Sequence, residues 1–272
     1  MALTINTNSG ANIALQTLNS VNNDLNSTAK RVQTGFRVAD AVDDASSFAV
    51  AQGLRGDLKA YDAVSRGLAQ GQGVASVALA GATAVSDLIG DMRGKITELS
   101  GDNLSAAQRT TITADLTALQ SQVDNAIANA SFNGTNLLQT ASTDANFLAN
   151  IDGTTLSLRA NDIEGAKTTF DGALDVSTAA AATTSLTALD TFETAVNTAL
   201  GTLGADSRSF DSQDALISKI KDATQEGLGA IVDADLPRES ARLQALQVQQ
   251  QLATQALAIA NSQPQTLLSL FR

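Results

Sequence analysis

The chain of 272 residues contains no histidine, cysteine or tryptophan, and it has one tyrosine and two prolines. Without histidine and cysteine, the usual zinc sites, cysteine nucleophiles, disulfides and histidine general bases are all excluded. Aromatic residues make up only 3% of the chain, whereas hydrophobic residues make up 43%. The core must therefore be built mainly from alanine, leucine, valine and isoleucine, which favours slim, closely packed helices.

Positive charge is also scarce, since 17 basic residues stand against 28 acidic ones and the net charge is −11. This balance argues against nucleic acid as a partner, because phosphate binding needs clustered lysine and arginine. Residues 1–23 and 243–271 carry no ionisable side chain. The C-terminal stretch is too rich in glutamine to enter a membrane, and asparagines interrupt any signal-peptide core at the N-terminus. We therefore expect no membrane insertion and, if the protein is exported, no cleaved signal peptide.

Both ends of the chain have the spacing of amphipathic helices with a heptad-like seam, in which apolar positions alternate at intervals of three and four. The predicted N-terminal seam consists of Ala11, Leu15, Leu18, Asn22, Leu25, Ala29, Val32 and Phe36. The predicted C-terminal seam consists of Leu243, Leu246, Gln250, Ala253, Leu257 and Ala260. We expect Pro237 to open the C-terminal helix and Pro264 to interrupt or close it.

The outer faces of these helices are polar but uncharged, which is unusual for an isolated coiled coil. One interpretation is an ordinary solvent face with few charges. The interpretation that we favour is a pair of helices surrounded by other helices after assembly, where a charge would cost desolvation energy.

The middle of the chain is predicted to be mostly helical. Helical patterns cover residues 41–130, with a break at 102–105, and resume from about residue 178 to residue 229. Asn133-Gly134 predicts a tight turn, and residues 146–175 alternate β-prone pieces with the turn signals Asp152-Gly153 and Asp171-Gly172. The predicted fold is mainly α, with long helices in coiled-coil or bundle packing, a small β-hairpin region, and the two termini paired in one inner domain.

Several short motifs suggest chemistry that their surroundings do not support. Ser27–Lys30 has the S-x-x-K spacing of serine β-lactamases but lacks the companion K-T-G motif. Gln70-Gly71-Gln72-Gly73 lacks the preceding strand and the third glycine of a dinucleotide-binding loop, and close helix packing explains its two glycines better. The acidic pairs at 43–44 and 233–235 do not continue into a calcium loop. We therefore predict no enzyme activity, no cofactor and no metal.

Specific strings at both ends resemble bacterial flagellins. They are residues 1–8 (MALTINTN), 33–45 (QTGFRVADAVDDA), 131–138 (SFNGTNLL), 239–246 (ESARLQAL), 255–261 (QALAIAN) and 262–272 (SQPQTLLSLFR). The resemblance covers about the first 140 and the last 60 residues in the expected order. It is most similar to the short flagellins of alphaproteobacteria.

The resemblance implies a structural subunit that polymerises into the flagellar filament used for motility. It implies an inner coiled-coil domain of residues 1–42 and 233–272, an outer helical domain with a β-hairpin at 43–232, and no further outer domain. The terminal segments of the family are disordered in the monomer and fold on polymerisation. The implied location is extracellular, in the filament. The implied partners are other copies of the chain, sibling flagellins, the flagellar export apparatus, a flagellin chaperone, and the filament cap and hook-junction proteins.

We expect the filament and coiled-coil interface to be formed by apolar residues of both ends. They are Leu3, Ile5, Leu15, Leu18, Leu25, Val32, Leu243, Leu246, Leu257, Leu267, Leu268, Leu270 and Phe271. Two alternatives remain at this stage. One is a hook–filament junction protein of the same axial structure, and the other is a secreted adhesin that uses Arg55-Gly56-Asp57, although that tripeptide lies in a predicted helix.

Overall fold

The structure, a computed structural model, describes the backbone of residues 7–270 and the side chains of residues 7–262. Contacts divide the chain into a terminal unit (residues 1–56 and 223–272) and a central unit (residues 57–222). The predicted assembly domains, divided after residues 42 and 232, stay a prediction. The elements, in chain order, are α1 (Ser9–Thr34), α2 (Ala45–Leu99), α3 (Ala106–Asn129), β1 (Ser131–Phe132), β2 (Thr135–Asn136), β3 (Ala145–Leu148), β4 (Thr155–Leu158), α4 (Ile163–Ala173), α5 (Ala179–Val232) and α6 (Leu236–Leu270).

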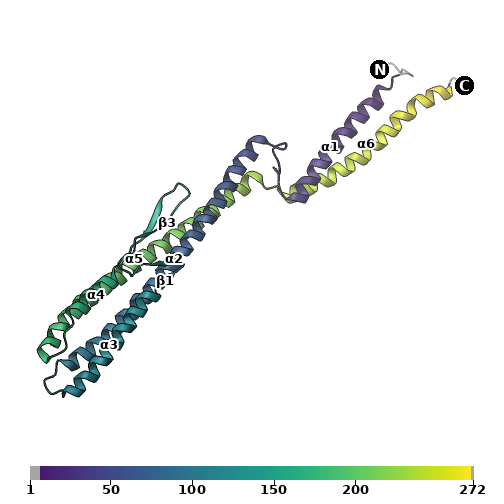
Figure 1. Cartoon of the computed structure of the whole chain (residues 1–272). Coiled ribbons are helices and arrows are strands. Elements are labelled where there is room, and N and C mark those ends of the chain that lie inside the picture. Colours follow the sequence, from purple (N-terminus) through teal and green to yellow (C-terminus); the bar gives the residue numbers. More distant parts are fainter. Residues whose placement is uncertain (1–6, 271–272) are drawn as a thin grey trace. The chain divides into compact units, whose positions relative to one another are not determined.

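In the terminal unit, α1 and α6 run side by side in opposite directions (Figure 1). Gln250 donates a hydrogen bond to Asn22, and Arg31 forms an ion pair with Glu239. Residue numbers thus increase along α1 as those of its partners on α6 decrease, so the two helices are antiparallel. The start of α1 and the end of α6 consequently lie at the same end of this helix pair (Figure 1). The predicted pairing of the two termini is thus present within a single chain.

The bounds of α1 follow from its capping residues. Asn8 caps the N-terminus, because its side chain accepts a hydrogen bond from the backbone N–H of Ala11 at 3.0 Å. At the other end, Gly35 has a φ of 74°, a left-handed conformation that glycine adopts without steric cost, and its N–H bonds to the carbonyl of Arg31. A short loop then leads to α2, and the backbone N–H of Arg37 bonds to the carbonyl of Val232 at the end of α5.

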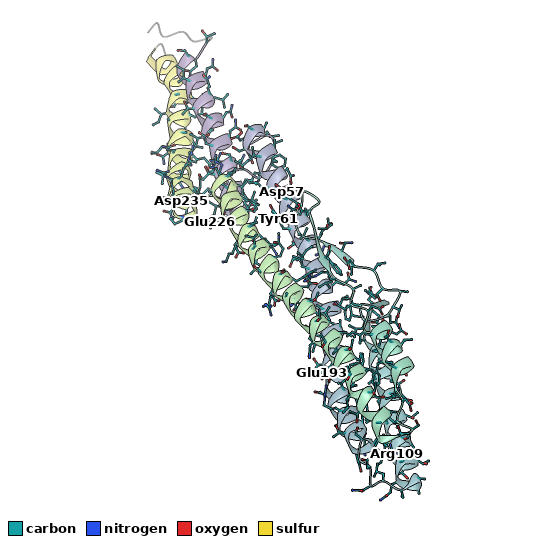
Figure 2. The ribbon with its side chains drawn as sticks, turned by 90° about the vertical axis from the view of Figure 1, so that its left-hand side faces the viewer. Asp57, Tyr61, Arg109, Glu193, Glu226 and Asp235 are labelled. Carbon is teal, nitrogen blue, oxygen red and sulfur yellow. The ribbon has the colours of Figure 1, made fainter. Side chains whose placement is uncertain are left out.

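In the central unit, α2, α3 and α5 lie lengthwise against one another, with α4 beside them (Figure 1). Their buried faces form an aliphatic core that contains three phenylalanines, Phe170, Phe192 and Phe210. The predicted break after α2 is confirmed, since Ser105 and Gln108 form a capping box at the start of α3. Arg109, labelled in Figure 2, then donates to the carbonyls of Leu99 and Val176 and ties the end of α2 to the segment before α5.

Two small antiparallel strand pairs follow α3. β1 and β2 meet at the predicted Asn133-Gly134 turn, in which both residues have positive φ, 50° and 81°. β3 pairs with β4 from Ala145 opposite Leu158 to Leu148 opposite Thr155. Gly153 in the turn of this hairpin also has a positive φ, of 90°. One of the predicted hairpins is therefore present.

The turn predicted at Asp171-Gly172 is wrong, because these residues lie within α4. Asp162 caps this helix through the backbone N–H of Gly165 at 2.7 Å, which starts a helix where the sequence had suggested a strand. Ile163, Lys167 and Phe170 then fall on one buried face at helical spacing. The helix is only 11 residues long and its buried face has three residues, one of them a lysine, so its helical period is hard to recognise in the sequence.

The end predicted for α6 is also wrong. Pro237 does lie in the first turn of α6, as predicted, but Pro264 lies inside the helix, which continues to Leu270. A proline in a helix interior removes one backbone hydrogen bond, so a helix that continues past it needs another donor for the freed carbonyl. The terminal unit contains such a donor, as described below.

One stretch of the described chain resembles a membrane span by composition. An 18-residue window of α2 has a mean hydropathy of 1.5, and 33% of it is buried inside the protein. The core helix of a globular unit passes the same test, and the side chains of α2 from Val74 to Leu99 supply much of the core of the central unit. Packing of the central unit therefore accounts for this hydropathy.

Candidate assembly surface on the terminal helices

The face of α6 toward α1 is the first candidate surface. Every predicted seam position of α6, from Leu243 to Ala260, is buried or half-buried, and Leu246 and Ala253 are the most deeply covered. The residues between these positions are exposed. This alternation shows that one stripe of α6 is covered within the single chain.

On α1 the covered stripe differs from the predicted one at its N-terminal part. Leu18, Leu25 and Val32 are half-buried, as the spacing indicated, and Val21 is buried. Leu15, however, is 47% exposed, and Ala14 is half-buried in its stead. Assigning Leu15 to the seam of the helix pair was therefore wrong. Hydrophobicity alone favours leucine over its alanine neighbour, but the geometry of the helix directs Ala14 inward.

Several of the predicted interface residues lie outside the part of the chain that the structure describes. Leu3, Ile5 and Phe271 are outside the described residues, and the side chains of Leu267, Leu268 and Leu270 are outside the described side chains. Their role in an interface stays a prediction, as does that of Leu243, Leu246 and Leu257 in contacts between subunits.

A second apolar stripe lies on the uncovered side of α6. Val248, Leu252 and Ile259 are 55%, 58% and 65% exposed. Because their spacing is four and seven residues, they share one face of the helix, and that face lies opposite the stripe centred on Leu246 and Ala253. No charged side chain interrupts α6 after Arg242. An apolar face of this kind on a protein surface is typical of a binding surface.

The opposite end of the helix pair, next to the loop between α1 and α2, is charged. Lys30 Nζ lies 2.6 Å from Asp40 Oδ2 and 3.2 Å from Asp43 Oδ2. The Lys30 ammonium is the main reason that the pKa of Asp40 is lowered, and the backbone N–H of Ala39 is the main reason for the lowered pKa of Asp43. Charges thus anchor the loop, whereas residues 9–23 of α1 and 243–270 of α6 carry none.

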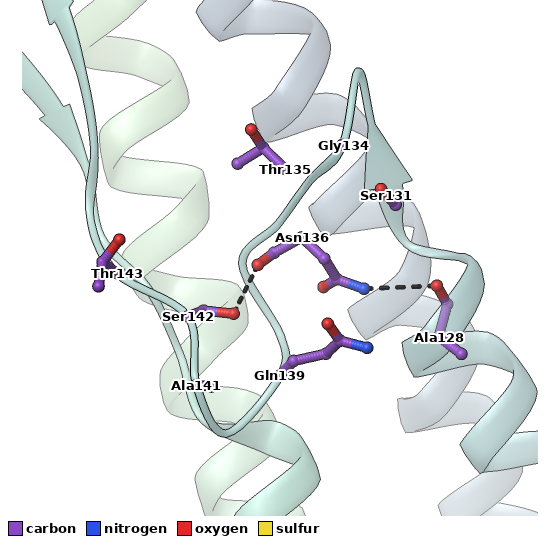
Figure 3. Close-up of a pocket in the computed structure, with 9 residues that line it drawn as sticks. All are labelled: Ala128, Ser131, Gly134, Thr135, Asn136, Gln139, Ala141, Ser142 and Thr143. Carbon is purple, nitrogen blue, oxygen red and sulfur yellow. Dashed lines mark hydrogen bonds between the residues drawn. The ribbon is translucent and has the colours of Figure 1, made fainter.

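The central unit offers a polar hollow near the β1–β2 turn, but not a chemical centre. Asn136 Nδ2 donates to the carbonyls of Ile127 and Ala128 at the end of α3, and Ser142 Oγ donates to the carbonyl of Asn136 (Figure 3). The residues lining the hollow carry no ionisable side chain. These contacts satisfy carbonyls that the end of a helix leaves free, so the hollow is a capping arrangement.

Two clusters of ion pairs on the central unit join neighbouring helices. Arg93 of α2 pairs with Asp190 at 2.6 Å and with Glu193, labelled in Figure 2, both on α5. Lys167 of α4 pairs with Asp124 at 2.7 Å and with Asp171 at 2.5 Å. Arg55-Gly56-Asp57 lies inside α2, so the tripeptide is not on the exposed turn that an adhesion loop requires.

Structural comparison identifies proteins that share this fold. A crystal structure of Bacillus cereus flagellin matches 56% of this chain and 88% of its own, with a TM-score of 0.51 and 22% identity. A putative flagellar hook-associated protein from Vibrio parahaemolyticus matches 70% of this chain and all of its own, with a TM-score of 0.60 and 16% identity. The fold is therefore that of helical proteins of the flagellum.

Sequence comparison specifies the family. The family model of the bacterial flagellin N-terminal helical region matches residues 5–143, and that of the C-terminal helical region matches residues 186–271. Flagellin FljO of Caulobacter vibrioides is 40% identical over the full length of both chains, and a flagellin of Brucella melitensis is 38% identical over 98% of each. The chain belongs to the bacterial flagellins, structural proteins, not enzymes, that polymerise into the extracellular flagellar filament.

Sequence patterns missed two features of the site. The helical spacing of Val248, Leu252 and Ile259 is a signal for the exposed stripe. The longer heptad-like seam through Leu246 and Ala253 was the only apolar face of α6 that the sequence analysis predicted. The contact between Asn8 and α6 has no periodic signal at all, because it joins residues 252 positions apart.

Proposed function

We propose that the exposed apolar stripe of α6 (Val248, Leu252 and Ile259) is a contact surface between subunits of the filament. The observation that carries the proposal is that α6 has apolar side chains on two opposite faces, and α1 covers only one of them. Burying a leucine side chain contributes roughly 1.5–3 kcal/mol, and a stripe repeated in every subunit multiplies this gain. The exposed Ile13 and Leu15 of α1 add further apolar area.

The geometry of a filament sets a second requirement. A helical polymer needs two different, complementary surfaces on each subunit, because its contacts do not close into a ring. A face without charge is suited to this because it can be surrounded by neighbouring helices without the cost of desolvating a charge. We infer that Leu3, Ile5 and Phe271, which lie outside the described residues, also take part in contacts between subunits.

Seeded polymerisation followed by negative-stain electron microscopy tests the proposal. Leu252→Asp places a charge on the stripe and is expected to abolish filaments. Leu252→Met keeps the apolar surface and is expected to form filaments at the wild-type subunit concentration. Circular dichroism of both variants should show an unchanged central unit. Filaments of Leu252→Asp at the wild-type critical concentration would place the contact surface elsewhere.

Export and assembly partners form the finer part of the proposal. We propose that the chain leaves the cell through the flagellar export apparatus with a flagellin chaperone and joins cap, hook-junction and sibling flagellin subunits. We also propose that no signal peptide is cleaved, because a cut within the uncharged first 23 residues would remove much of α1 and its half of the helix pair. An unchanged N-terminus in secreted protein, measured by mass spectrometry, is the expected result.

The likeness to a hook-associated protein does not favour the junction alternative. At 16% identity it shows a shared fold, whereas the full-length curated relatives are named flagellins. Long filaments are expected from the purified chain, and short rings would favour the junction protein.

A further inference from the structure

Pro264 leaves one carbonyl of α6 without its ordinary partner. In an α-helix the carbonyl of residue 260 accepts a hydrogen bond from the N–H of residue 264, and proline has no N–H. The helix nevertheless continues to Leu270. Ala260 itself is half-buried against α1. An unpaired carbonyl at such a place costs free energy comparable to a lost hydrogen bond.

Asn8, immediately before α1, supplies the missing donor. Its Nδ2 donates to the carbonyl of Ala260 at 2.6 Å, while its Oδ1 accepts from the backbone N–H of Ala11 at 3.0 Å. The opposite orientation of the amide would place oxygen against oxygen and N–H against N–H, so these partners fix the orientation. One side chain therefore caps the start of α1 and completes the hydrogen bonding of α6.

The backbones are also close at this point. A Cβ atom at Gly10 would lie 3.4 Å from Asn8 Oδ1 and 3.9 Å from Ala260 Cβ, in ordinary van der Waals contact. The first turn of α1 therefore packs directly on the turn of α6 that precedes Pro264. A shift of either helix by one turn, about 5.4 Å, would break the Asn8 contact.

We propose that Asn8 and Pro264 form a junction that makes the last turns of α6 conditional on the docking of α1. When α1 is docked in register, Asn8 satisfies the Ala260 carbonyl and α6 continues past Pro264. When α1 is not docked, the proline leaves that carbonyl unpaired within the helix and the C-terminal turns lose support. Asn8 is thus a positioning residue that fixes the register of the helix pair. The inference rests on the proposed function in that the filament is the state in which the pair performs its role.

A double-mutant cycle isolates this contact. Asn8→Ser keeps an N-cap acceptor but removes the longer side chain whose amide NH2 reaches the Ala260 carbonyl. Pro264→Ala restores the backbone N–H that donates to the same carbonyl within the helix. Asn8→Ser is expected to raise the critical concentration for filament growth about three- to tenfold, the factor for loss of one hydrogen bond. In the Pro264→Ala background the same substitution is expected to leave the critical concentration unchanged.

Hydrogen–deuterium exchange of the segment 261–270 provides a second measurement. Faster exchange is expected in filaments of Asn8→Ser and wild-type protection in the Asn8→Ser, Pro264→Ala double variant. If Asn8→Ser had the same effect in the wild-type chain and in the Pro264→Ala variant, Asn8 would act only as an N-cap of α1, and the proposal would be overturned. No effect in either background would overturn it as well.

The failure of the proposed function has a different signature. If the wild-type chain formed no filaments, the proposed filament role would be wrong. The Asn8–Pro264 junction would then be tested by hydrogen–deuterium exchange of the soluble chain. Protection of residues 261–270 that Asn8→Ser removes and Pro264→Ala restores would still support it. If circular dichroism showed α1 and α6 to be folded in the soluble chain and Asn8→Ser left the exchange of residues 261–270 unchanged, the proposal would be overturned.

Discussion

Close approach at single residues explains the glycines of α2. A Cβ atom at Gly81 would lie 2.5 Å from Ala130 Cβ and 3.1 Å from Leu138 Cδ1, and one at Gly71 would collide with the ring of Phe210. A Cβ atom at Gly67, in contrast, would meet no atom within 4 Å beyond its own stretch of helix. The prediction that close helix packing explains Gly71 and Gly73 is confirmed for Gly71, which faces Phe210 of α5, whereas Gly73 faces Phe132 of β1. The sequence suggested that glycines of α2 allow close packing, but only the structure shows which of them have a close neighbour.

This difference gives a matched pair of substitutions. Gly81→Ala is expected to lower the free energy of unfolding of the central unit by about 1–3 kcal/mol, because the added methyl group overpacks the contact with Ala130. Gly67→Ala adds the same methyl group in open space and is expected to raise it by up to about 1 kcal/mol through helix propensity. Urea denaturation followed by circular dichroism measures both. Equal effects of the two substitutions would contradict this account.

At the scale of elements, the sequence predicted the features that a repeated spacing marks and missed those that depend on one side chain. The seam of α6 and the break before Ser105 follow from spacing and capping signals that many residues share. The helix α4 and the continuation of α6 through Pro264 depend on single side chains, Asp162 and Asn8. A sequence pattern cannot show which distant partner will satisfy a free carbonyl, so these were the places where the predictions were wrong.

The charged loop at the base of α1 predicts a dependence on pH. The folded structure lowers the pKa of Asp40, first through its hydrogen bond with Lys30, below the ordinary value of 3.8. A carboxyl with a lowered pKa contributes stability above its ordinary pKa and loses it as the pH falls through the folded value. The raised pKa of Lys30 contributes stability that is complete below the ordinary lysine value of 10.5. Both contributions are therefore present at neutral pH, and only the carboxyl term is lost in acid.

We expect filaments to dissociate more readily as the pH falls below about 4, in part because this loop is weakened. Lys30→Met removes the partner of Asp40 and is expected to flatten this part of the pH dependence while lowering stability at pH 7. Light scattering of filaments across an acid series measures the effect. Identical pH profiles for Lys30→Met and the wild-type chain would exclude a contribution from the ion pair.

At the scale of the whole molecule, the chain has more apolar helix surface than it covers by itself. The absence of charge at both ends predicted this property, and the exposure of Val248, Leu252 and Ile259 places it on one face of α6. The family and the mainly helical fold could be predicted from the sequence because long uncharged heptads and the terminal motifs are spread over many residues. The face that meets a neighbour could not, because both faces of α6 are apolar and only burial distinguishes them.

An electron cryo-microscopy map of filaments assembled from the wild-type chain tests the central claim most directly. The account predicts that Val248, Leu252 and Ile259 of each subunit are buried against a neighbouring subunit, while Leu246 and Ala253 remain packed on α1 of the same chain. A filament in which this outer face of α6 is open to solvent would contradict it.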